Sequence, residues 1–455
     1  MCASSLFLAL TIGGPPAPRA QAQAQAPSAA PAPTPAVSEA ALRAVIEERW
    51  RGDRTGACVA AALIDQTVSR AFVCADPARA RPLDSQTTFE IGSVTKTMTA
   101  FLLADLIDQG KLSLEDTLAQ HLPKATKVPT FGDSPIRLKH LVTHTSGLPP
   151  LPGRMAVPDP DNPYANLSED ALLGSLGDVV LKEAPGSRWA YSNFAVMLLS
   201  YVVSHTAGRD IESLLADRLF GPLGMAQAHV TKKPKGVRTA QGHLPTGLET
   251  SAWDIPANLA GVGGVRASLD DMIRYARAEL GRVDGGPTKK TVARVSALMA
   301  KTQQPVDLGG GSKPVGPRMG MGWVLAPVGD GVVAIHEGGT GGFSSYIAVE
   351  KGDGPSGGRA VVILCDTAVH SIGGLSDLGL HLLHPTHPMS KPRKPAVPTA
   401  ALLDSLTGDY RLANGLAMKV TTQGGLCSFR PRVKAQLKCP STARAISIRA
   451  PSTRR

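Results

Sequence analysis

One long apolar segment dominates the hydrophobic pattern of the chain and begins just after Ser93. Apolar positions from Met98 to Ile107 cover more than one stripe of a helix, so we expect this helix to be buried on most sides. Gly110 is expected to end it. Residues 194–205 predict a second strongly apolar helix, and residues 39–51 predict a first helix ahead of both.

Short runs of β-forming residues lie on either side of this helical region. Residues 57–64 and 68–73 predict an N-terminal hairpin. Beyond residue 317, four more strands with hairpin connections predict antiparallel pairing: residues 321–326, 332–336, 344–349 and 359–364. The pattern therefore predicts an α/β fold of the α+β type, with an antiparallel sheet flanked by helices. A mostly helical lobe is expected between Leu112 and Gly261.

Both ends of the chain differ in composition from its middle. Residues 1–26 combine a short apolar run with small-residue cleavage sites and predict a signal peptide, although a basic start is missing. Residues 27–38 predict an Ala/Pro-rich linker, residues 39–387 the main domain, and residues 388–400 a second linker. Residues 401–455 open as two strands about an Asn-Gly turn and predict a partial β-rich segment.

The net charge of +11 is concentrated at the C-terminus. Residues 426–455 hold eight basic and no acidic side chains, which leaves +3 for the rest of the chain. A nearly balanced body argues against a nucleic-acid partner. The aperiodic, acid-free end suggests, as a hypothesis, a frameshifted or recombined terminus. No stretch reaches the length that spans a bilayer, so no stable membrane insertion is expected.

Neither the cysteines nor the histidines predict a metal site. The six cysteines fit no metal-binding spacing. Cys58 and Cys74 close the two runs of the N-terminal hairpin, where a disulfide and two separate buried thiols both remain open. His381, His384 and His387 are spaced by threes, but a proline interrupts the helix that would align them. No metal or other cofactor is expected.

Ser93 and Lys96 stand three residues apart at the start of the apolar helix, and therefore on one face. An ammonium group entering such a core must be paired or lose its proton, and a neutral amine can take a proton from serine. The pair is thus a candidate base and nucleophile. The alternative is a capped helix that carries a solvated lysine.

Two further segments carry candidate site residues. Tyr191 and Asn193 alternate in an extended stretch before a buried helix, so they project to the same side. A core tyrosine and a helix-capping asparagine are the alternative. His336, Gly338 and Gly339 lie at a strand end, where glycines allow close backbone approach and exposed amides can hold an oxyanion. The alternative is a plain glycine-rich hairpin. A dinucleotide loop is excluded because no helix follows.

Three pieces of the chain together resemble a known set of motifs. Ser93-Val94-Thr95-Lys96, Tyr191-Ser192-Asn193 and His336-Glu337-Gly338 are similar, in this order, to the S-x-x-K, Y-x-N and K/H-x-G motifs of the class C β-lactamase and penicillin-binding-protein superfamily of serine hydrolases. The resemblance spans roughly residues 40–385. It is strengthened by residues 144–148, 185–186, 222–225 and 342–343.

The resemblance implies a role for each site residue. Ser93 is expected to be the nucleophile, with Lys96 and Tyr191 sharing the general-base role. Asn193 is expected to orient the lysine and the substrate amide. The backbone N–H groups of Ser93 and Gly339 are expected to form the oxyanion hole. Tyr191 would then activate water for deacylation.

The third motif departs from the lactamase form, because His336 stands where many members carry lysine. A neutral histidine holds a substrate carboxylate less well. D-amino-acid peptides or simple esters are therefore favoured as substrates over efficiently hydrolysed β-lactams. His336, Gly338, Gly339 and Asn193 remain the expected substrate-binding residues.

The resemblance implies a serine hydrolase that works through an acyl-enzyme on D-Ala-type peptides or β-lactams. The signal-like residues 1–26 predict that it is periplasmic or secreted. A carboxylesterase and a non-hydrolytic penicillin-binding or sensor protein are the alternatives. The expected partners are small molecules or peptides, namely peptidoglycan fragments, β-lactams or esters. The oligomeric state is left open.

Overall fold

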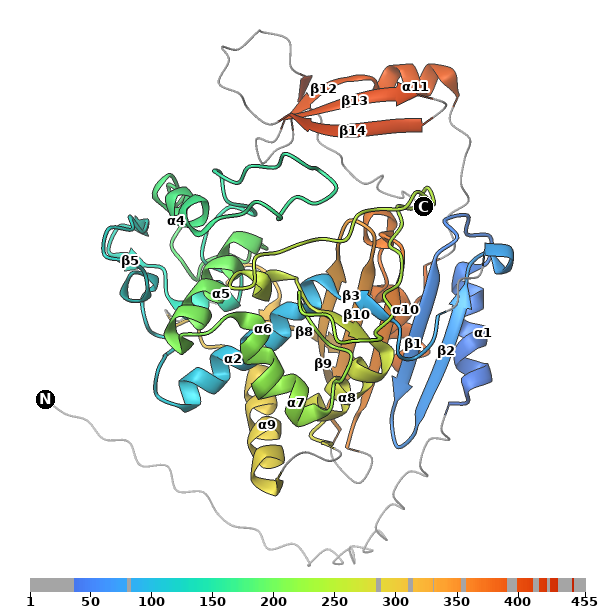
Figure 1. Ribbon diagram of the computed structural model, residues 1–455, viewed down its shortest axis with the longest axis horizontal. Coiled ribbons are helices and arrows are strands. Elements are labelled where there is room, and N and C mark those ends of the chain that lie inside the picture. Colours follow the sequence, from blue (N-terminus) through green and yellow to red (C-terminus); the bar gives the residue numbers. More distant parts are fainter. Residues whose placement is uncertain are drawn as a thin grey trace, which may run out of the picture. The chain divides into compact units, whose positions relative to one another are not determined.

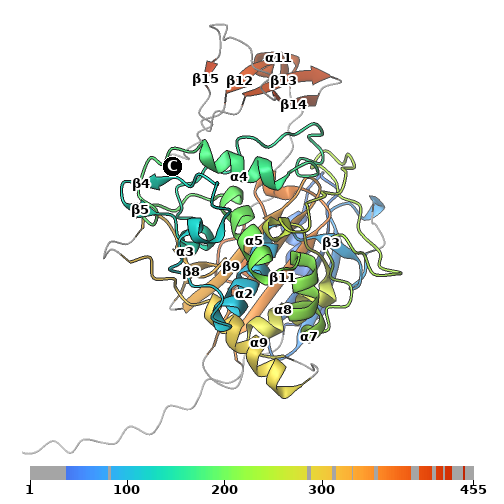
Figure 2. The ribbon, with the colours of Figure 1, turned by 60° about the vertical axis from the view of Figure 1, so that its left-hand side comes forward.

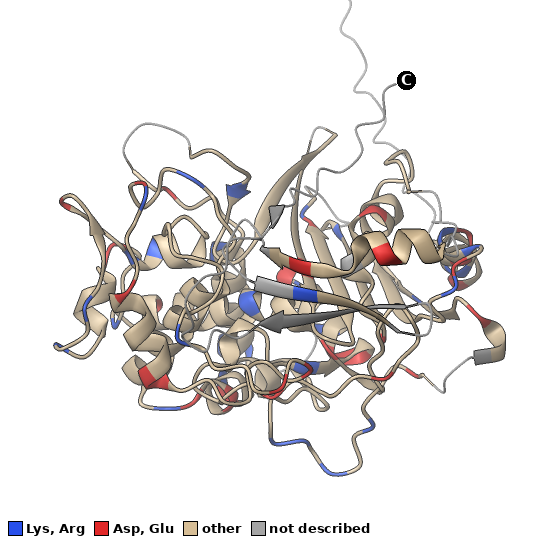
Figure 3. Cartoon of the chain, turned by 90° about the horizontal axis from the view of Figure 1, so that it is seen from above, with Lys and Arg blue, Asp and Glu red and all other residues tan. Residues whose placement is uncertain are grey.

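The computed structural model describes residues 37–79, 83–283, 288–309, 314–329, 331–352, 357–390, 399–411, 417–423, 426–432 and 444–445. The expected signal peptide, most of both expected linkers and most of the basic tail lie outside these ranges. Over the described part, acidic and basic side chains are interspersed (Figure 3).

A seven-stranded antiparallel sheet forms the centre of the main domain (Figure 1). Its order is β2-β1-β11-β10-β9-β8-β7, so the N-terminal hairpin pairs with the last strand. The strands are β1 (Cys58–Ile64), β2 (Val68–Cys74), β7 (Arg318–Met319), β8 (Val324–Val328), β9 (Gly331–Gly339), β10 (Ser344–Glu350) and β11 (Arg359–Cys365). The expected antiparallel sheet is confirmed.

Most strand boundaries differ from the prediction by one residue, whereas β9 runs three residues further, to Gly339, and β8 is shifted along the chain. β8 begins at Val324 rather than at residue 321. Gly322 has a φ of 73° and its N–H donates to the Val142 carbonyl, while the Met321 N–H donates to the Thr302 carbonyl. These bonds hold residues 321–322 against the helical part of the domain, away from the sheet ladder.

Helices cover both faces of this sheet. All seven residues of β1 are buried, because successive side chains enter different cores. Val59, Ala61 and Leu63 join a core with α1 (Glu39–Trp50) and α10 (Ser376–Leu383). The alternate residues of β1 join the larger core on the opposite face. That core contains α2 (Thr95–Asp108), α8 (Leu269–Glu279) and α9 (Lys289–Thr302).

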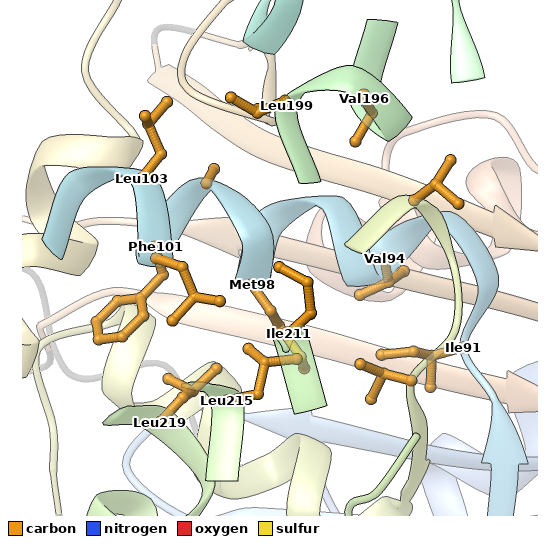
Figure 4. Close-up of a cluster of buried hydrophobic side chains, with 14 of the residues drawn as sticks. Ile91, Val94, Met98, Phe101, Leu103, Val196, Leu199, Ile211, Leu215 and Leu219 are labelled. Carbon is orange, nitrogen blue, oxygen red and sulfur yellow. The ribbon is translucent and has the colours of Figure 1, made fainter. Parts of the chain in front are cut away.

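α2 is the most enclosed helix, as its sequence predicts. Every residue from Thr95 to Leu106 is buried. Figure 4 shows Met98 and Phe101 beside Ile211, Leu215 and Leu219, with Val196 and Leu199 on another side of the helix. Figures 1 and 2 place α2 between the sheet and the helical lobe. Gly110, with a φ of 69°, follows its last turn.

The lobe between Leu112 and Gly261 carries helices and one short hairpin. Its helices are α3 (Leu138–Val142), α4 (Glu169–Gly177), α5 (Asn193–Ala207), α6 (Ile211–Leu215), a π-helix (Ala216–Phe220) and α7 (Gly221–Leu223). The hairpin pairs β4 (Thr130–Phe131) with β5 (Ser134–Pro135). The remaining elements of the main domain are the 3-10 turns Pro77–Arg79, Gly92–Val94, Leu118–His121, Ala260–Val262 and Val369–Ile372, and the strands β3 (Thr88–Glu90) and β6 (Arg266–Ser268). β3 pairs with β6 and leads directly to Ser93.

A separate small sheet occupies the C-terminal part. It has the order β14-β13-β12-β15, and the expected pair of strands corresponds to β12 and β13. Its elements are α11 (Ala400–Leu406), β12 (Gly408–Arg411), β13 (Ala417–Gln423), β14 (Leu426–Arg432) and β15 (Arg444–Ala445). The expected Asn-Gly turn lies outside the described residues.

The structure decides between the two readings of the hairpin cysteines. Cys58 and Cys74 lie opposite each other in the β1–β2 ladder and form a disulfide. The described part of the chain holds no group of three potential metal ligands. None of the helices in that part combines the length and apolar character needed to cross a bilayer.

Candidate active site

Ser93 and Lys96 meet at the beginning of α2. Gly92–Val94 form a 3-10 turn that leads straight into the helix. The Lys96 Nζ donates a hydrogen bond to the Ser93 Oγ at 2.9 Å. Lys96 is buried, whereas Ser93 is partly exposed. The hydroxyl is therefore accessible from outside, while the amine beside it is shielded from water.

Burial changes the acidity of Lys96. Its Nζ also donates to the Val262 carbonyl at 2.6 Å. The two acceptors of this amine, the carbonyl and the Ser93 hydroxyl, are uncharged groups. Removal from water lowers the pKa of Lys96 to about 7, because burial disfavours the charged form. A substantial fraction of this amine is therefore uncharged near neutral pH and able to accept a proton.

Tyr191 completes a three-residue cluster. Its phenol interacts with the Ser93 side chain, and the Lys96 Nζ lies 5.2 Å from the centre of its ring. Burial raises the pKa of Tyr191, and the interaction with Ser93 opposes that rise. The phenol therefore holds its proton at neutral pH while the neighbouring amine can be neutral. Groups from two distant segments of the chain are thus arranged for proton exchange.

His144 determines how Tyr191 is placed. Its carbonyl accepts the Ala190 N–H at 2.8 Å, and its Nδ1 accepts the Ser192 N–H at 3.2 Å. These bonds tie Ala190 and Ser192, the two residues that flank the tyrosine. The His144 ring lies against the Tyr191 ring, with 4.3 Å between centroids. His144 itself adopts a left-handed φ of 57°, a strained conformation for a side chain of this type.

The role of His144 was not predicted, although the residue belongs to a segment that strengthens the resemblance. Burial and the nearby Lys96 lower the pKa of His144 well below its ordinary value. The imidazole is therefore neutral, as its acceptor role at Nδ1 requires.

The end of β9 lies against the turn that carries Ser93. Gly92 has a φ of 47°, and a Cβ on it would lie 2.7 Å from the Gly339 nitrogen. A Cβ on Gly338 would collide with the Ile91 carbonyl, which also accepts a 2.7 Å hydrogen bond from the Ser345 hydroxyl. Glycine is thus required on both sides of this contact. The backbone of Gly339 is placed beside the peptide that precedes Ser93.

His336 is buried in the same cluster. Its Nδ1 is 2.9 Å from the Glu337 carbonyl, so the ring donates there. Burial, followed by the charge of Lys96, lowers the pKa of His336 to about 3. The ring is therefore neutral near pH 7 and supplies no fixed positive charge. The carboxylate of the neighbouring Glu337 accepts hydrogen bonds from the Leu375 N–H at 2.7 Å and the Ser376 hydroxyl at 2.9 Å.

Asn193 is the first residue of α5, but it is not the cap of that helix. Ser192 caps α5 by accepting the Ala195 N–H at 3.0 Å, and its hydroxyl donates to the Pro149 carbonyl at 2.7 Å. The Asn193 Nδ2 donates to the Tyr164 hydroxyl at 3.4 Å. The structure thus brings Asn193 to a residue that the sequence had not singled out.

Tyr164 ends the proline-rich loop of residues 149–164, a kind of segment that usually lies at the surface. Its side chain is instead buried, and its ring packs edge-on against Trp253 with 5.1 Å between centroids. The Trp253 N–H donates to the buried carboxylate of Glu90 at 2.9 Å, and Arg266 pairs with the same oxygen at 3.1 Å. Nothing local distinguishes Tyr164 in the sequence, because its contacts come from segments far along the chain.

Comparison with known proteins gives consistent results. The sequence model of the Beta-lactamase family matches residues 42–371. The D-alanyl-D-alanine-carboxypeptidase/endopeptidase AmpH of Escherichia coli K12 is 32% identical over 268 residues, which cover 57% of this chain and 66% of AmpH. The chain thus spans just under two thirds of that relative. Esterase EstB of Burkholderia gladioli is 27% identical over 345 residues, covering 67% of this chain and 84% of EstB.

Solved structures share the architecture. A class C beta lactamase from Rhodobacter sphaeroides superposes with a TM-score of 0.55 at 23% identity, covering 72% of this chain and 93% of that one. The octameric penicillin-binding protein homologue from Pyrococcus abyssi gives a TM-score of 0.58 at 21% identity, covering 87% and 91%. The main domain therefore has the fold seen in these proteins.

Proposed function

Because the chain belongs to the Beta-lactamase family, we propose that it is a serine hydrolase that forms an acyl-enzyme on Ser93. The observation that carries this proposal is the cluster at the start of α2, where Lys96 Nζ lies 2.9 Å from the Ser93 hydroxyl and 5.2 Å from the centre of the Tyr191 ring. A nucleophile with a base in hydrogen-bond reach is the arrangement that acyl transfer needs.

The pKa values of Lys96 and Tyr191 indicate which group accepts a proton and which donates one during acylation. Lys96, with its pKa lowered to about 7, accepts the Ser93 proton as the Oγ attacks the substrate carbonyl. The oxyanion that forms is held by the backbone N–H groups of Ser93 and Gly339, worth about 3 kcal/mol each. When the intermediate collapses, the leaving group takes a proton from Tyr191. Lys96 then returns a proton to Tyr191, so the pair ends as it began.

Deacylation uses the same groups. A water molecule attacks the ester carbonyl of the acyl-enzyme and gives its proton to the Lys96–Tyr191 pair. The Ser93 Oγ leaves as the C–O bond breaks and recovers a proton from that pair. The products are a carboxylic acid and free enzyme.

The first substrate class is the amide bond of D-Ala-type peptides or β-lactams. AmpH, which aligns with 57% of the chain, is described as a D-alanyl-D-alanine-carboxypeptidase/endopeptidase. Asn193, at the edge of the same cluster, would orient the substrate amide, and His336 and Gly338 would line the neighbouring wall.

A carboxylesterase is the second candidate, and the state of His336 favours it. β-Lactams and D-Ala peptides carry a carboxylate, whereas a simple ester does not. A buried histidine whose pKa is lowered to about 3 offers that carboxylate no charge. EstB, described as an esterase, aligns with 67% of the chain.

We further propose that the protein acts in the periplasm or outside the cell, with residues 39–387 as the hydrolase domain. The signal-like residues 1–26 support export. The Cys58–Cys74 disulfide fits an oxidising compartment.

The test is a turnover panel on the wild type and Ser93→Ala. It uses a short acyl ester, a cephalosporin and a D-Ala-D-Ala peptide, with mass spectrometry for a covalent adduct and Ser113→Ala as the matched control. We expect turnover and an adduct on Ser93 that Ser93→Ala abolishes and the control retains. A stable adduct without turnover would favour a penicillin-binding or sensor protein. Failure of a fluorophosphonate to label Ser93 would refute the proposal.

A further inference from the structure

Two polar atoms beside Tyr164 have unmet hydrogen-bonding capacity. The Asn193 Oδ1 and the Trp253 Nε1 are both buried, and neither finds a hydrogen-bond partner among the described residues. Both side chains contact Tyr164, one through the 3.4 Å bond to its hydroxyl and the other through ring packing. Burying a donor or acceptor without a partner is costly. The loop that carries Tyr164 therefore covers one acceptor and one donor that are suited to binding a ligand.

Hydrogen bonds hold the loop at its start, at Arg154 and near Tyr164. The Arg154 backbone N–H donates to the Ser175 hydroxyl at 2.9 Å, and its guanidinium bonds with the exposed Asp178. At its start, the Pro149 and Pro150 carbonyls accept from the Ser192 hydroxyl and the Phe194 N–H. Near Tyr164, Asn162 and Asp254 exchange two hydrogen bonds of 2.9 and 2.8 Å, and both bonds are solvent-exposed. Exposed hydrogen bonds gain little over the bonds these groups make to water.

Trp253, by contrast, is rigidly supported. Its backbone N–H is bound to Glu90, and its backbone carbonyl accepts from Arg266 at 2.7 Å. A Cβ on Gly341 would lie 2.8 Å from its Nε1, so the strand connection after β9 presses on the indole. Tyr164 thus lies between a fixed wall and the Asn193 carboxamide.

A carboxamide is complementary to another amide. It can donate from Nδ2 to a carbonyl and accept at Oδ1 from an N–H. The Tyr164 hydroxyl takes one of the two Nδ2 hydrogens and leaves Oδ1 without a partner among the described residues. An amide in the acyl part of a substrate would use both, but it can reach Asn193 only by displacing Tyr164.

We propose that Tyr164 is a specificity-determining residue that occupies Asn193 and thereby favours substrates with a plain acyl group over those whose acyl group carries an amide. This inference rests on the proposed acyl-enzyme chemistry at Ser93. It separates the two candidate substrate classes, because acylamino side chains are disfavoured while short acyl esters need no displacement.

The test compares two esters that share a leaving group and a scissile bond. They are p-nitrophenyl propionate and p-nitrophenyl N-acetyl-D-alaninate, which adds the amide. The readout is the ratio of kcat/KM for the second to that for the first. We expect Tyr164→Ala to raise the ratio about tenfold, the equivalent of one net hydrogen bond. Tyr164→Phe, which keeps the ring, should raise it less.

Arg154→Gln is the matched control, because Arg154 lies in the same loop but bonds with the exposed Asp178. Its ratio should match the wild type. Ratios within twofold of the wild type in both Tyr164 variants would overturn the inference, as would an equal rise in the control. If Tyr164→Ala unfolds, Tyr164→Phe alone decides. A wild type that turns over neither ester and resists fluorophosphonate would overturn the proposed function as well, and with it this inference.

Discussion

The imidazole of His144 lies against the phenol ring of Tyr191 with 4.3 Å between ring centroids and 32° between their planes. The same residue hydrogen-bonds to Ala190 and Ser192, which flank that tyrosine. A strained backbone conformation persists only where its surroundings enforce it, so the contact is a defined structural feature rather than incidental packing.

Replacement of His144 should therefore impair catalysis through Tyr191. His144→Asn tolerates the left-handed conformation and keeps an acceptor, but it loses the imidazole ring. We expect kcat for a p-nitrophenyl ester to fall about tenfold, with KM little changed, because a misplaced catalytic group costs rate. In a Tyr191→Phe background the same substitution should have little further effect. An equal loss in both backgrounds would show that His144 acts independently of the phenol.

Removal of either proton-transfer group should abolish most acylation. Lys96→Ala and Tyr191→Phe are each expected to lower the rate of adduct formation by about 100-fold to 10,000-fold, the usual contribution of general acid–base catalysis. Circular dichroism and thermal unfolding should show an intact fold. Lys96→Met, which keeps the buried volume, separates loss of the amine from a cavity effect. Near-normal acylation in either variant would contradict the assigned role.

Acylation should depend on the protonation of Lys96. The pKa of this amine is lowered to about 7, and only its neutral form accepts a proton. The kcat/KM for a neutral ester should therefore rise with pH and level off above about 7. Measurement from pH 5 to 9 checks this profile against the Ser93-independent background in Ser93→Ala. A rate that is flat across this range would exclude Lys96 as the base.

Glu279 should make the protein less stable as pH rises. A carboxylate in an ion pair does the opposite, because its stabilising effect is lost as pH falls. Glu279 is buried beside Gln303, whose Nε2 donates to it at 2.5 Å, and burial raises its pKa to about 7. The folded state thus holds this proton when the unfolded state has lost it, so its contribution to stability falls as pH rises from about 4.5 to above 7.

The matched variant is Glu279→Gln, which keeps the shape and removes the titration. Its melting temperature should change less between pH 5 and pH 8 than that of the wild type, and the variant should be the more stable of the two at pH 8. Identical pH dependence in both proteins would show that Glu279 does not titrate in this range.

Gly92 should not tolerate a side chain. Gly92→Ala would strain a φ of 47° and place a methyl group 2.7 Å from the Gly339 nitrogen. We expect a loss of about 1–3 kcal/mol in unfolding free energy and severe loss of acylation. Gly110→Ala is the control, since its φ of 69° is also left-handed but nothing lies within 4 Å of the added carbon. It should lose less stability, because only the backbone strain applies, and keep its activity; equal acylation rates in the two variants would contradict the steric argument.

Features that depend on local spacing could be predicted from the sequence. The enclosed helix α2, the antiparallel strands and the placement of Ser93 and Lys96 on one helical face all follow from the periods of helices and strands. The motif pattern also named Tyr191, His336 and Gly339, which the fold gathers near α2.

Contacts between distant segments were decided by the tertiary structure. The Val262 carbonyl beside Lys96, the His144 ring on Tyr191 and the Tyr164 hydroxyl on Asn193 have no local signal, because each depends on how separate segments pack. The lowered pKa of Lys96 has the same origin, since burial is a property of the packed core. Sequence alone therefore determined which chemical groups the protein carries. Packing decided which of them meet and in what protonation state, because distance and dielectric environment exist only in the folded chain.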